Sequence, residues 1–471
     1  LDTKIVKGDG SVENIKDIRP GDIVLRKSEV GEVVKGEVAG SFPTGDKKVY
    51  EVTTESGRRI EVTKDHPLFS LDGWTDAKDL SVGDFVAVPR SYPNLGQEEY
   101  DPKLLRVLGY MIGDGCTRGC TQFSNTSDEV IQDFRECLPK PCNLNHRETC
   151  NYAVVGYGRG SSSKHPILDL VRGEWSLWNK YSHEKTIPDF VFRLKNDLIA
   201  EVLGAYFACD GWILDRAFGL STSSKELRDQ VYHLLLRFGI QPRARSKETT
   251  HRDAYCITVR GRNNIKKFNE CFDIPGKDKI RVCNTSTNVD YIPDFPLKRC
   301  YDIREVGDSE GYKLLRSCRR PKYITRYKAK ELSNHFGIGE DLASSDIFWD
   351  KIENIKDNGF KPTWDLTMKS GANFVANDIF AHNTWCGPKW LYREISENPG
   401  NDWMVAAPTF SLLEDAALDE LWKFFDGTDL EGEDRGVRNK KRYDLPDGGR
   451  IYYRSTDRPE SLEAKHIKGV W

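Results

Sequence analysis

Two stretches of this chain repeat each other about 97 residues apart, and this repeat limits the possible folds more than any other feature. One is Leu108-Gly-Tyr-Met-Ile-Gly-Asp-Gly115 and the other is Leu203-Gly-Ala-Tyr-Phe-Ala-Cys-Asp-Gly211. A strand-like run and then an amphipathic stretch that opens with Ser or Thr follow each copy. Each copy predicts a helix that stops at Asp-Gly, a strand and a capped helix. The middle of the chain should therefore hold two copies of one α+β unit.

A shorter repeat lies near the N-terminus. The segment Ile15–Val24 recurs 62 positions later as Ala77–Val86, and in both copies a Gly-Asp turn leads into an apolar, strand-like run. Between other strand-like runs we expect Gly45-Asp46 to break the chain into separate strands. Residues 1–95 are therefore predicted to be all-β, and residues 363–382 return to the same composition.

Composition narrows the class of protein. Apolar residues make up 38% and charged residues 30% of the 471 positions, and no apolar run approaches the roughly 18 residues that a bilayer requires. We therefore expect a soluble, monomeric protein without a membrane partner. The 12 Cys have scattered spacings and follow no secretory leader, which is typical of thiols in a reducing cytoplasm.

Charge is distributed unevenly along the chain. The net charge is −3, but residues 185–330 contain 29 Lys and Arg against 18 Asp and Glu. Aromatic residues lie among these cations, a pattern typical of nucleic-acid binding, in which cations contact phosphates and aromatic rings stack on bases. For any single cluster, a solvated basic face is the alternative. The residues that we expect to contact double-stranded DNA are Arg243, Arg245, Lys247, Arg260, Arg262, Lys266 and Lys267.

The ends of the predicted β region carry groups suited to breaking a peptide bond. Thr63 and His66 place a hydroxyl and an imidazole three positions apart, and Asn383 lies between His382 and Thr384. An Asn side chain can attack its own backbone carbonyl, with an imidazole as proton donor, and a hydroxyl can hold an acyl group as an ester. The pattern indicates self-cleavage after Asn383.

With these residues at both ends, residues 1–383 resemble an intein of the large, endonuclease-containing kind. Leu1-Asp-Thr-Lys-Ile5 is similar to the family's opening block, whose first residue is normally Cys or Ser. Since that residue is absent before Leu1, we expect the chain to be a fragment. Trp364-Asp365 and Asn373–Asn383 are similar to the two closing blocks, although Ala372 stands where many members have His.

The resemblance implies protein splicing without a cofactor. Thr63 and His66 would polarise the first acyl shift, and Thr384 would take over the acyl group. Asn383 would then cyclise with help from His382, and Asp365 belongs to the same set of splicing residues. A processing domain that only cleaves remains an alternative.

The two Asp-Gly repeats resemble the LAGLIDADG motif of homing endonucleases. The resemblance implies that Asp114 and Asp210 hold Mg²⁺ at a shared centre and cut both DNA strands. Lys185 matches a family lysine near the cleavage centre, and Lys277 or Lys279 is the candidate in the second copy. Small residues such as Gly109 and Gly113 would let the two helices approach closely. A domain that binds DNA without cutting it is the alternative.

Several cysteines allow a zinc hypothesis as a minor alternative. They are Cys116, Cys120, Cys137, Cys142 and Cys150, together with His146. Their spacings lack the paired Cys-x-x-Cys pattern of structural zinc sites.

Residues 384–471 resemble part of the ATPase domain of a phage terminase large subunit. Thr384 and the helical stretch after it are similar to the end of a phosphate-binding loop and its helix. This implies the cytoplasm of a phage-infected or prophage-carrying prokaryote, with the flanking ATPase as the splicing partner.

The predicted fold is therefore multidomain. An all-β splicing domain (Hint) is split by an α+β endonuclease of two αββαββ-like repeats, and a partial α/β P-loop ATPase segment follows. The expected boundaries are 1–95 and 346–383 for the β domain, 96–345 for the endonuclease (repeats 101–195 and 196–300, basic extension 301–345) and 384–471 for the flank.

Overall fold

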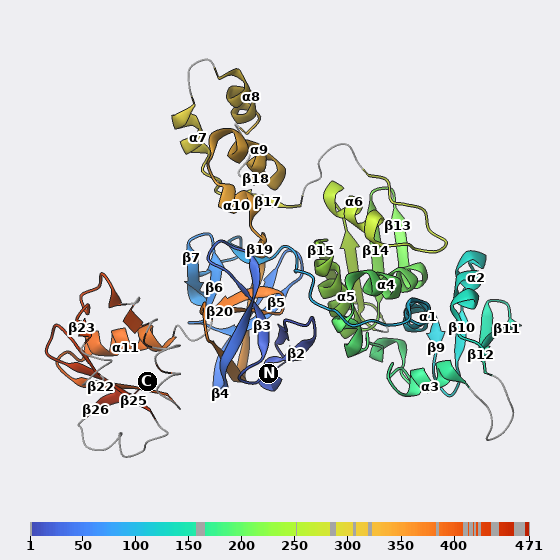
Figure 1. Cartoon of the computed structure of the whole chain (residues 1–471), viewed down its shortest axis with the longest axis horizontal. Coiled ribbons are helices and arrows are strands. Elements are labelled where there is room, and N and C mark those ends of the chain that lie inside the picture. Colours follow the sequence, from blue (N-terminus) through green and yellow to red (C-terminus); the bar gives the residue numbers. More distant parts are fainter. Residues whose placement is uncertain are drawn as a thin grey trace.

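The computed structural model describes residues 2–156, 165–250, 252–282, 289–304, 308–318 and 323–382. In the last part of the chain it describes residues 386–407, 413, 418, 421–422, 425–434, 442–455 and 467–470. A central β domain contains strands from both ends of the first 382 residues (Figure 1). The two repeats, a small helical unit and a C-terminal unit surround it.

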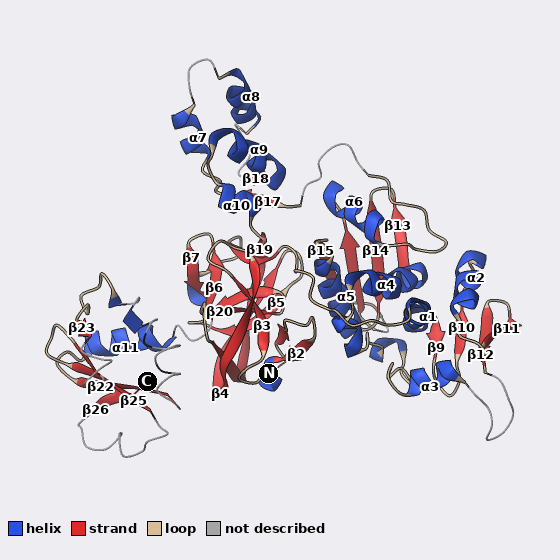
Figure 2. Cartoon of the chain, in the orientation of Figure 1, coloured by secondary structure: helices blue, strands red, loops and turns tan. Residues whose placement is uncertain are grey.

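The central β domain is one 11-stranded sheet. Its early strands are β1 (Lys4–Val6), β2 (Val12–Asn14), β3 (Ile23–Lys27), β4 (Val33–Thr54), β5 (Arg59–Thr63), β6 (Pro67–Ser70), β7 (Gly73–Asp76) and β8 (Phe85–Pro89). Its late strands are β19 (Ile347–Met368), β20 (Asn373–Ala376) and β21 (Ile379–His382). Early and late strands are interspersed in this sheet. Its strand order is β2-β1-β20-β21-β6-β8-β19-β4-β3, and β5 pairs with β4 and β7 with β6. Strands from both parts of the sequence therefore form one sheet, whose strands are red in Figure 2.

The longest strands of the sheet are β4 and β19, which pair antiparallel from Thr54 opposite Ile352 to Val38 opposite Met368. The prediction that Gly45-Asp46 breaks the strand is wrong, because β4 continues through both residues. Gly45 has φ +85°, and the register shifts where it faces Thr363. The pair forms a bulge, in which the left-handed glycine bends a strand without ending it.

The insertion between β8 and β19 contains the two repeats. The first consists of α1 (Pro102–Gly113), β9 (Gly115–Cys116), β10 (Gln122–Ser124), α2 (Asp128–Cys137), β11 (Asn143–Glu148), β12 (Asn151–Val155) and α3 (Pro166–Arg172). The second consists of α4 (Asn196–Asp210), β13 (Gly211–Leu214), β14 (Ala217–Thr222), α5 (Lys225–Arg237), β15 (Pro242–Lys247), β16 (Ala254–Val259) and α6 (Arg262–Cys271). The strand orders β9-β10-β12-β11 and β13-β14-β16-β15 correspond, and the Ser127 and Ser224 hydroxyls cap α2 and α5. The predicted duplicated α+β unit is confirmed.

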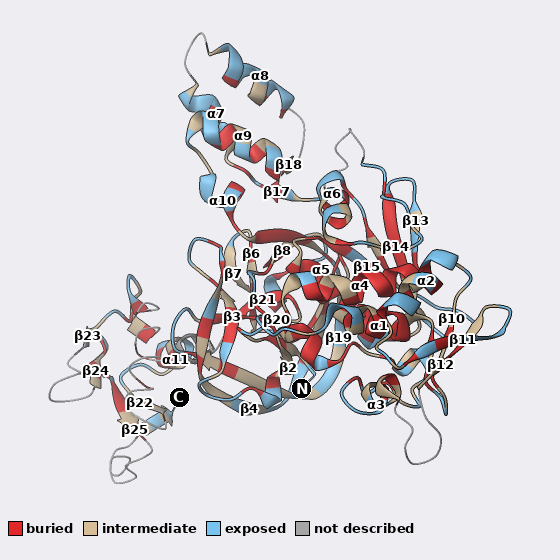
Figure 3. Cartoon of the chain, turned by 45° about the vertical axis from the view of Figure 1, so that its right-hand side comes forward, coloured by how far each residue is buried: buried red, intermediate tan, exposed pale blue. Residues whose placement is uncertain are grey.

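Helices α1 and α4 pack against each other at the centre of the insertion, where buried residues concentrate (Figure 3). A Cβ atom added at Gly109 would lie 2.2 Å from the Val202 carbonyl oxygen, and one added at Gly113 would lie 2.5 Å from Cys209 Cβ. The predicted close approach at these glycines is confirmed, and it brings the C-terminal ends of both helices together.

Two further units complete the described chain. The helical unit contains β17 (Tyr291–Pro293), α7 (Leu297–Ile303), α8 (Ser309–Ser317), β18 (Tyr323–Thr325), α9 (Arg326–Phe336) and α10 (Glu340–Ser344). This unit has its own small core, which begins at Ile292. The expected boundary between the second repeat and the basic extension, at residue 300, lies inside α7. None of the described helices is long and apolar enough to cross a membrane.

The C-terminal unit combines a helix with a mixed sheet. It contains α11 (Cys386–Glu397), β22 (Asp402–Ala407), β23 (Glu433–Asp434), β24 (Arg442–Asp444), β25 (Arg450–Ser455) and β26 (Ile467–Val470). Strand β22 runs parallel to both β25 and β26, whereas β24 pairs antiparallel with β25.

Candidate functional site

The central β domain brings the two candidate catalytic histidines to the ends of neighbouring strands. His66 directly precedes β6, and His382 is the last residue of β21. The two strands pair antiparallel with Ala381 opposite Leu68, so β21 ends where β6 begins. His382 is 4% exposed and packs edge-on against Trp74, with ring centroids 4.6 Å apart. Two residues more than 300 positions apart, His66 and His382, therefore lie at the same end of this strand pair.

His66 is held in the neutral form. Burial lowers its pKa to about 4, although Asp76 nearby acts in the opposite direction. Its Nε2 atom is buried and has no hydrogen-bond partner among the described residues. Its backbone N–H donates to the Thr63 carbonyl over 3.1 Å, which keeps the two residues of the predicted pair together. A neutral imidazole with a free ring nitrogen can donate one hydrogen bond and accept another.

Of the other predicted splicing residues, only Asp365 lies among the described residues. Asp365 lies on β19 opposite Phe42, with one carboxylate oxygen accepting the Leu366 N–H over 2.8 Å. Asn383 and Thr384 lie outside the described residues. The first described strand, β1, pairs with β20 through Ile5 and Ala376, so it lies beside the hairpin that β20 forms with β21.

The insertion contributes a second candidate site at the C-terminal ends of α1 and α4. Asp114 follows the last residue of α1, and Asp210 is the last residue of α4. Burial and the neighbouring Asp114 carboxylate raise the pKa of Asp210 to about 6. The Asn125 amide donates to one Asp114 oxygen over 2.6 Å. The structure thus brings together the two carboxylates that the repeat predicted.

One lysine accompanies each carboxylate, Lys185 being buried and Lys277 partly exposed. The Lys185 ammonium donates to the carbonyls of Met111, Ile112, Gly113 and Gly115 over 2.6–3.2 Å, at the end of α1. Lys277 donates to the Ala208 carbonyl over 2.7 Å, at the end of α4. Burial lowers the pKa of both lysines, and the two aspartates oppose this effect.

Of the two lysines considered for the second copy, Lys277 is the one at the carboxylates. Lys279 instead donates to the carbonyls of Asn269 and Phe272. Spacing alone could not separate the two, because they are two residues apart in a turn-rich segment.

The predicted DNA-contact residues fall into two groups. Arg243, Arg245 and Lys247 are exposed and alternate along β15 with Ala244, whose side chain belongs to the core under the helices. They therefore share the sheet face opposite the helices. Arg243 pairs with Glu55 over 3.0 Å and Arg245 with Glu353 over 3.4 Å, both carboxylates of the central β domain.

The second group lies elsewhere. Arg260 is an exposed residue after β16, and Arg262, Lys266 and Lys267 lie on α6. Helix α6 packs its buried side chains into the core on the helix side of the sheet. Lys267 donates to the Gly239 carbonyl over 2.9 Å and Lys266 pairs with Glu270, so the α6 cations do not share the face of Arg243.

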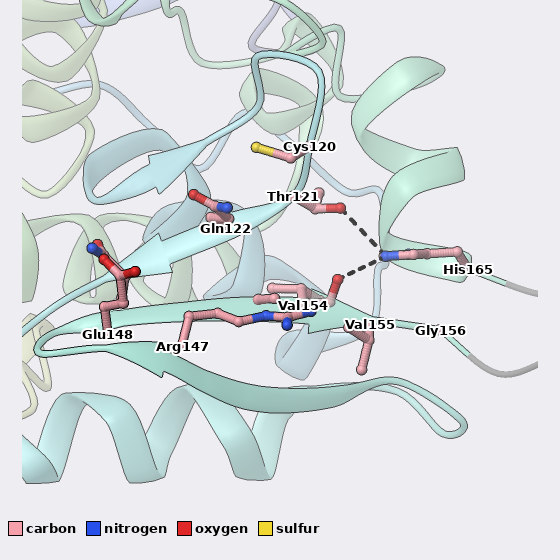
Figure 4. Close-up of a pocket in the computed structure, with 11 residues that line it drawn as sticks. Cys120, Thr121, Gln122, Arg147, Glu148, Val154, Val155, Gly156 and His165 are labelled. Atoms are coloured by element: carbon pink, nitrogen blue, oxygen red, sulfur yellow. Dashed lines mark hydrogen bonds between the residues drawn. The ribbon is translucent and has the colours of Figure 1, made fainter.

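A cavity of about 640 Å³ opens on the first repeat's sheet (Figure 4). Gln122, Asn151 and Ala153 line it, and they alternate with Phe123 and Tyr152, whose side chains pack towards the helices. The cavity therefore occupies the face that corresponds to that of Arg243 in the second repeat. Thr121 and the Val154 carbonyl contact His165 Nε2 over 3.3 and 3.0 Å at its edge.

The cysteines considered for zinc do not assemble a metal cluster among the described residues. Within that part of the chain, no group of three or more His, Cys, Asp or Glu side chains is placed to hold an ion. Cys137 and Cys142 are buried, and burial raises the pKa of both thiols.

The sequence matches the model of one protein family, described as "Intein splicing domain", over residues 7–383. The replicative DNA helicase DnaB of Rhodothermus marinus is 28% identical over 390 residues, which are 74% of this chain and 41% of that protein. The DnaB of Synechocystis sp. is 27% identical over 414 residues, 79% of this chain and 47% of that protein. The chain thus spans less than half the length of these relatives.

Two solved structures are similar to parts of this chain. The Ssp DnaB mini-intein variant M86 is 12% identical and covers 81% of this chain and 90% of its own, with a TM-score of 0.27. A DnaB intein from Synechocystis sp. PCC 6803 is 30% identical and covers 19% of this chain and 66% of its own, with a TM-score of 0.19.

Proposed function

Because this chain belongs to the intein splicing domain family, we propose that His66, Thr63, His382, Asn383 and Thr384 carry out its splicing. The observation that carries the proposal is the meeting of β21 and β6, which ends one strand at His382 where the other begins after His66. Strand β1 pairs with β20, the other strand of the hairpin that ends at His382, through Ile5 and Ala376.

The proposed reaction has four steps. A Cys or Ser joined to Leu1 attacks the preceding peptide carbonyl and forms a thioester or ester, with Thr63 and neutral His66 polarising the carbonyl. The Thr384 hydroxyl then takes over the acyl group. Next, the Asn383 amide nitrogen attacks its own carbonyl carbon; the bond to the Thr384 nitrogen breaks, and that nitrogen takes up a proton with help from His382. A shift of the acyl group from oxygen to this free amine leaves an ordinary peptide bond.

Mass spectrometry tests the splicing residues. With Cys and a short tagged segment joined before Leu1, the expected products are the Cys followed by residues 1–383, ending in a succinimide, and the tag ligated to Thr384. The Asn383→Ala variant should release neither residues 1–383 nor the ligated product. Release of the flank from Asn383→Ala, or cleavage without any ligated product in the parent, would contradict splicing by this route; the latter would favour a cleavage-only domain.

For the insertion we propose a double-strand DNA endonuclease with Asp114 and Asp210 as catalytic residues. Two carboxylates at the ends of closely packed helices support it, together with the pKa of Asp210, which burial and the neighbouring Asp114 carboxylate raise to about 6. Hard oxygen donors of this kind fit Mg²⁺, which would activate water and neutralise a leaving oxygen when bound. Asp114 and Asp210 would hold the metal, and Asn125 would orient the Asp114 carboxylate.

The lysines and the sheet faces have separate roles in this proposal. Lys185 and Lys277 fix the helix ends that carry the carboxylates. The face with Arg243, Arg245 and Lys247 would meet DNA phosphates, and the cavity on the first repeat lies on the equivalent face. The pairs to Glu55 and Glu353 are exposed and contribute only about 0–1 kcal/mol each, so phosphates can replace them.

DNA cleavage tests the endonuclease. A duplex carrying the uninterrupted host sequence should be cut on both strands in the presence of Mg²⁺. The Asp114→Asn variant should bind this duplex without cutting it, and Arg245→Gln should weaken binding with a smaller salt dependence. A parent that binds but never cuts would favour the alternative, a DNA-binding insertion without nuclease activity.

For the C-terminal unit we propose part of a phage terminase ATPase, as host in a prokaryotic cytoplasm. The parallel pairing of β22 with β25 and β26, after helix α11, supports an α/β unit of this class. Thr384 would close its phosphate-binding loop only after splicing. ATP hydrolysis that appears only in the spliced host protein would support this assignment, and equal hydrolysis before splicing would contradict it.

A further inference from the structure

The hairpin that ends at His382 is held at its turn as well as along its strands. Strands β20 and β21 are joined by Asn377 and Asp378, which have φ values of +48° and +59°. Asn377 accepts the Lys4 N–H over 2.7 Å and donates to the Arg59 carbonyl over 2.9 Å. One turn residue therefore fixes the hairpin to the central β domain.

The other turn residue fixes the hairpin to the insertion. One Asp378 carboxylate oxygen accepts hydrogen bonds from the Tyr92 hydroxyl over 2.5 Å and from His233 Nδ1 over 2.8 Å. All three side chains are buried, and His233 lies in the middle of α5. Burial alone would raise the pKa of Asp378, but His233, Arg58 and Tyr92 hold it below its ordinary value. The carboxylate is thus charged and depends on these partners.

The two faces of the hairpin also contact different domains. Phe374, Ala376, Ile379 and Ala381 pack into the core of the central β domain. Val375 and Phe380, which face each other across the hairpin, belong to the core that also contains the side chains of α4 and α5. The insertion therefore supports both the turn and one face of the segment that ends at His382.

We propose that His233 is a positioning residue for cleavage after Asn383, acting through Asp378 and the hairpin. The inference rests on the proposed roles of His382 and Asn383. Succinimide formation requires the Asn383 amide nitrogen to approach its own carbonyl carbon, with His382 beside the leaving nitrogen. A small displacement of reacting groups costs such a step about a hundredfold in rate. Without the Nδ1 donor, Asp378 is a buried charge with one partner fewer, and the turn must move to hydrate it.

Variants at two adjacent positions of α5 test the inference in the full chain. His233→Leu removes the donor at similar volume, whereas His233→Asn keeps an N–H near the Nδ1 position. Tyr232→Phe is the matched control, because it removes another buried hydrogen bond from α5 to the β domain, the one to Ser56 Oγ over 2.8 Å. The readout is the rate at which the fragment beginning at Thr384 appears by mass spectrometry, together with the melting temperature of each variant.

We expect His233→Leu to slow release of the fragment by about tenfold to a hundredfold, with His233→Asn within about threefold of the parent. Tyr232→Phe should cleave at the parental rate even if it melts at as low a temperature as His233→Leu. Parental cleavage by His233→Leu, or equal slowing by Tyr232→Phe, would overturn the inference. If Asn383→Ala still releases the fragment, or the parent never does, the proposed function fails instead, and the positioning role with it.

Discussion

At the scale of single residues, the environment of His66 decides how it can act. Its imidazole is removed from water without an ionic partner strong enough to keep it charged, which lowers its pKa to about 4. It is therefore neutral at neutral pH. The sequence identified the residue by its spacing from Thr63, but burial is set by strands distant in the chain.

The same pKa predicts how stability depends on pH. The unfolded chain binds a proton on His66 below its ordinary pKa of 6.5, whereas the folded chain does so only near pH 4. The stabilising contribution is thus present above pH 6.5 and is lost as the pH falls to 4, by about 2–3 kcal/mol. Denaturant titrations of the parent and His66→Gln should diverge across this range. Parallel curves would show that the histidine titrates normally.

Lys185 offers a second residue-scale prediction. Its ammonium donates to four backbone carbonyls at the end of α1 and is 4% exposed. Lys185→Met should lower the free energy of unfolding by about 3 kcal/mol, because these carbonyls lose a charged donor. Lys279→Met, at an exposed lysine that also donates to carbonyls, should cost less than about 1 kcal/mol. Equal losses in chemical denaturation would contradict a special role for Lys185.

At the scale of elements, the approach of α1 to α4 sets the distance between the two carboxylates. Gly109→Ala gains helix propensity, yet its methyl carbon would lie 2.2 Å from the Val202 carbonyl. We expect a net loss of about 2–3 kcal/mol by thermal or chemical unfolding, with weaker DNA cleavage, because the helices must separate. Adding Ala205→Gly should not restore the loss, since the nearest atom is backbone. Full restoration would show that only side chains clash.

The elements also show why one prediction failed. The local sequence at Gly45-Asp46 is typical of a turn, but β19 supplies hydrogen-bond partners to β4 from Val38 to Thr54, and the glycine is accommodated as a bulge. A pairing strand far away in sequence thus outweighed the local turn signal.

At the scale of the whole molecule, the central β domain and the repeats share one buried interface. Arg58 donates to Asp350 over 3.2 Å and to Gln241 over 3.0 Å, with the two charged side chains 1% and 3% exposed. Several β-domain residues, among them Ala87 and Ile347, belong to the core cluster of the repeats, while the β domain also has a core of its own and the C-terminal unit has a separate one. The insertion is thus integrated with the domain that it interrupts.

Calorimetry should detect this integration. We expect one major transition for the β domain with the repeats and a separate one for the C-terminal unit. Asp350→Ala should destabilise only the major transition, by about 3–5 kcal/mol, because it leaves Arg58 buried without its counter-ion. Independent melting of the repeats, or an equal shift of both transitions, would contradict this arrangement.

Periodicity, glycine turns and repeated motifs are local properties, and they were enough to predict the duplicated α+β unit, the β character of both flanking regions and the candidate paired groups. The folded chain was needed to show that β21 ends where β6 begins, that Lys277 rather than Lys279 lies at the end of α4 and that His233 bonds to Asp378. Strand pairing and burial join residues hundreds of positions apart, and these contacts set the pKa values and positions that chemistry requires.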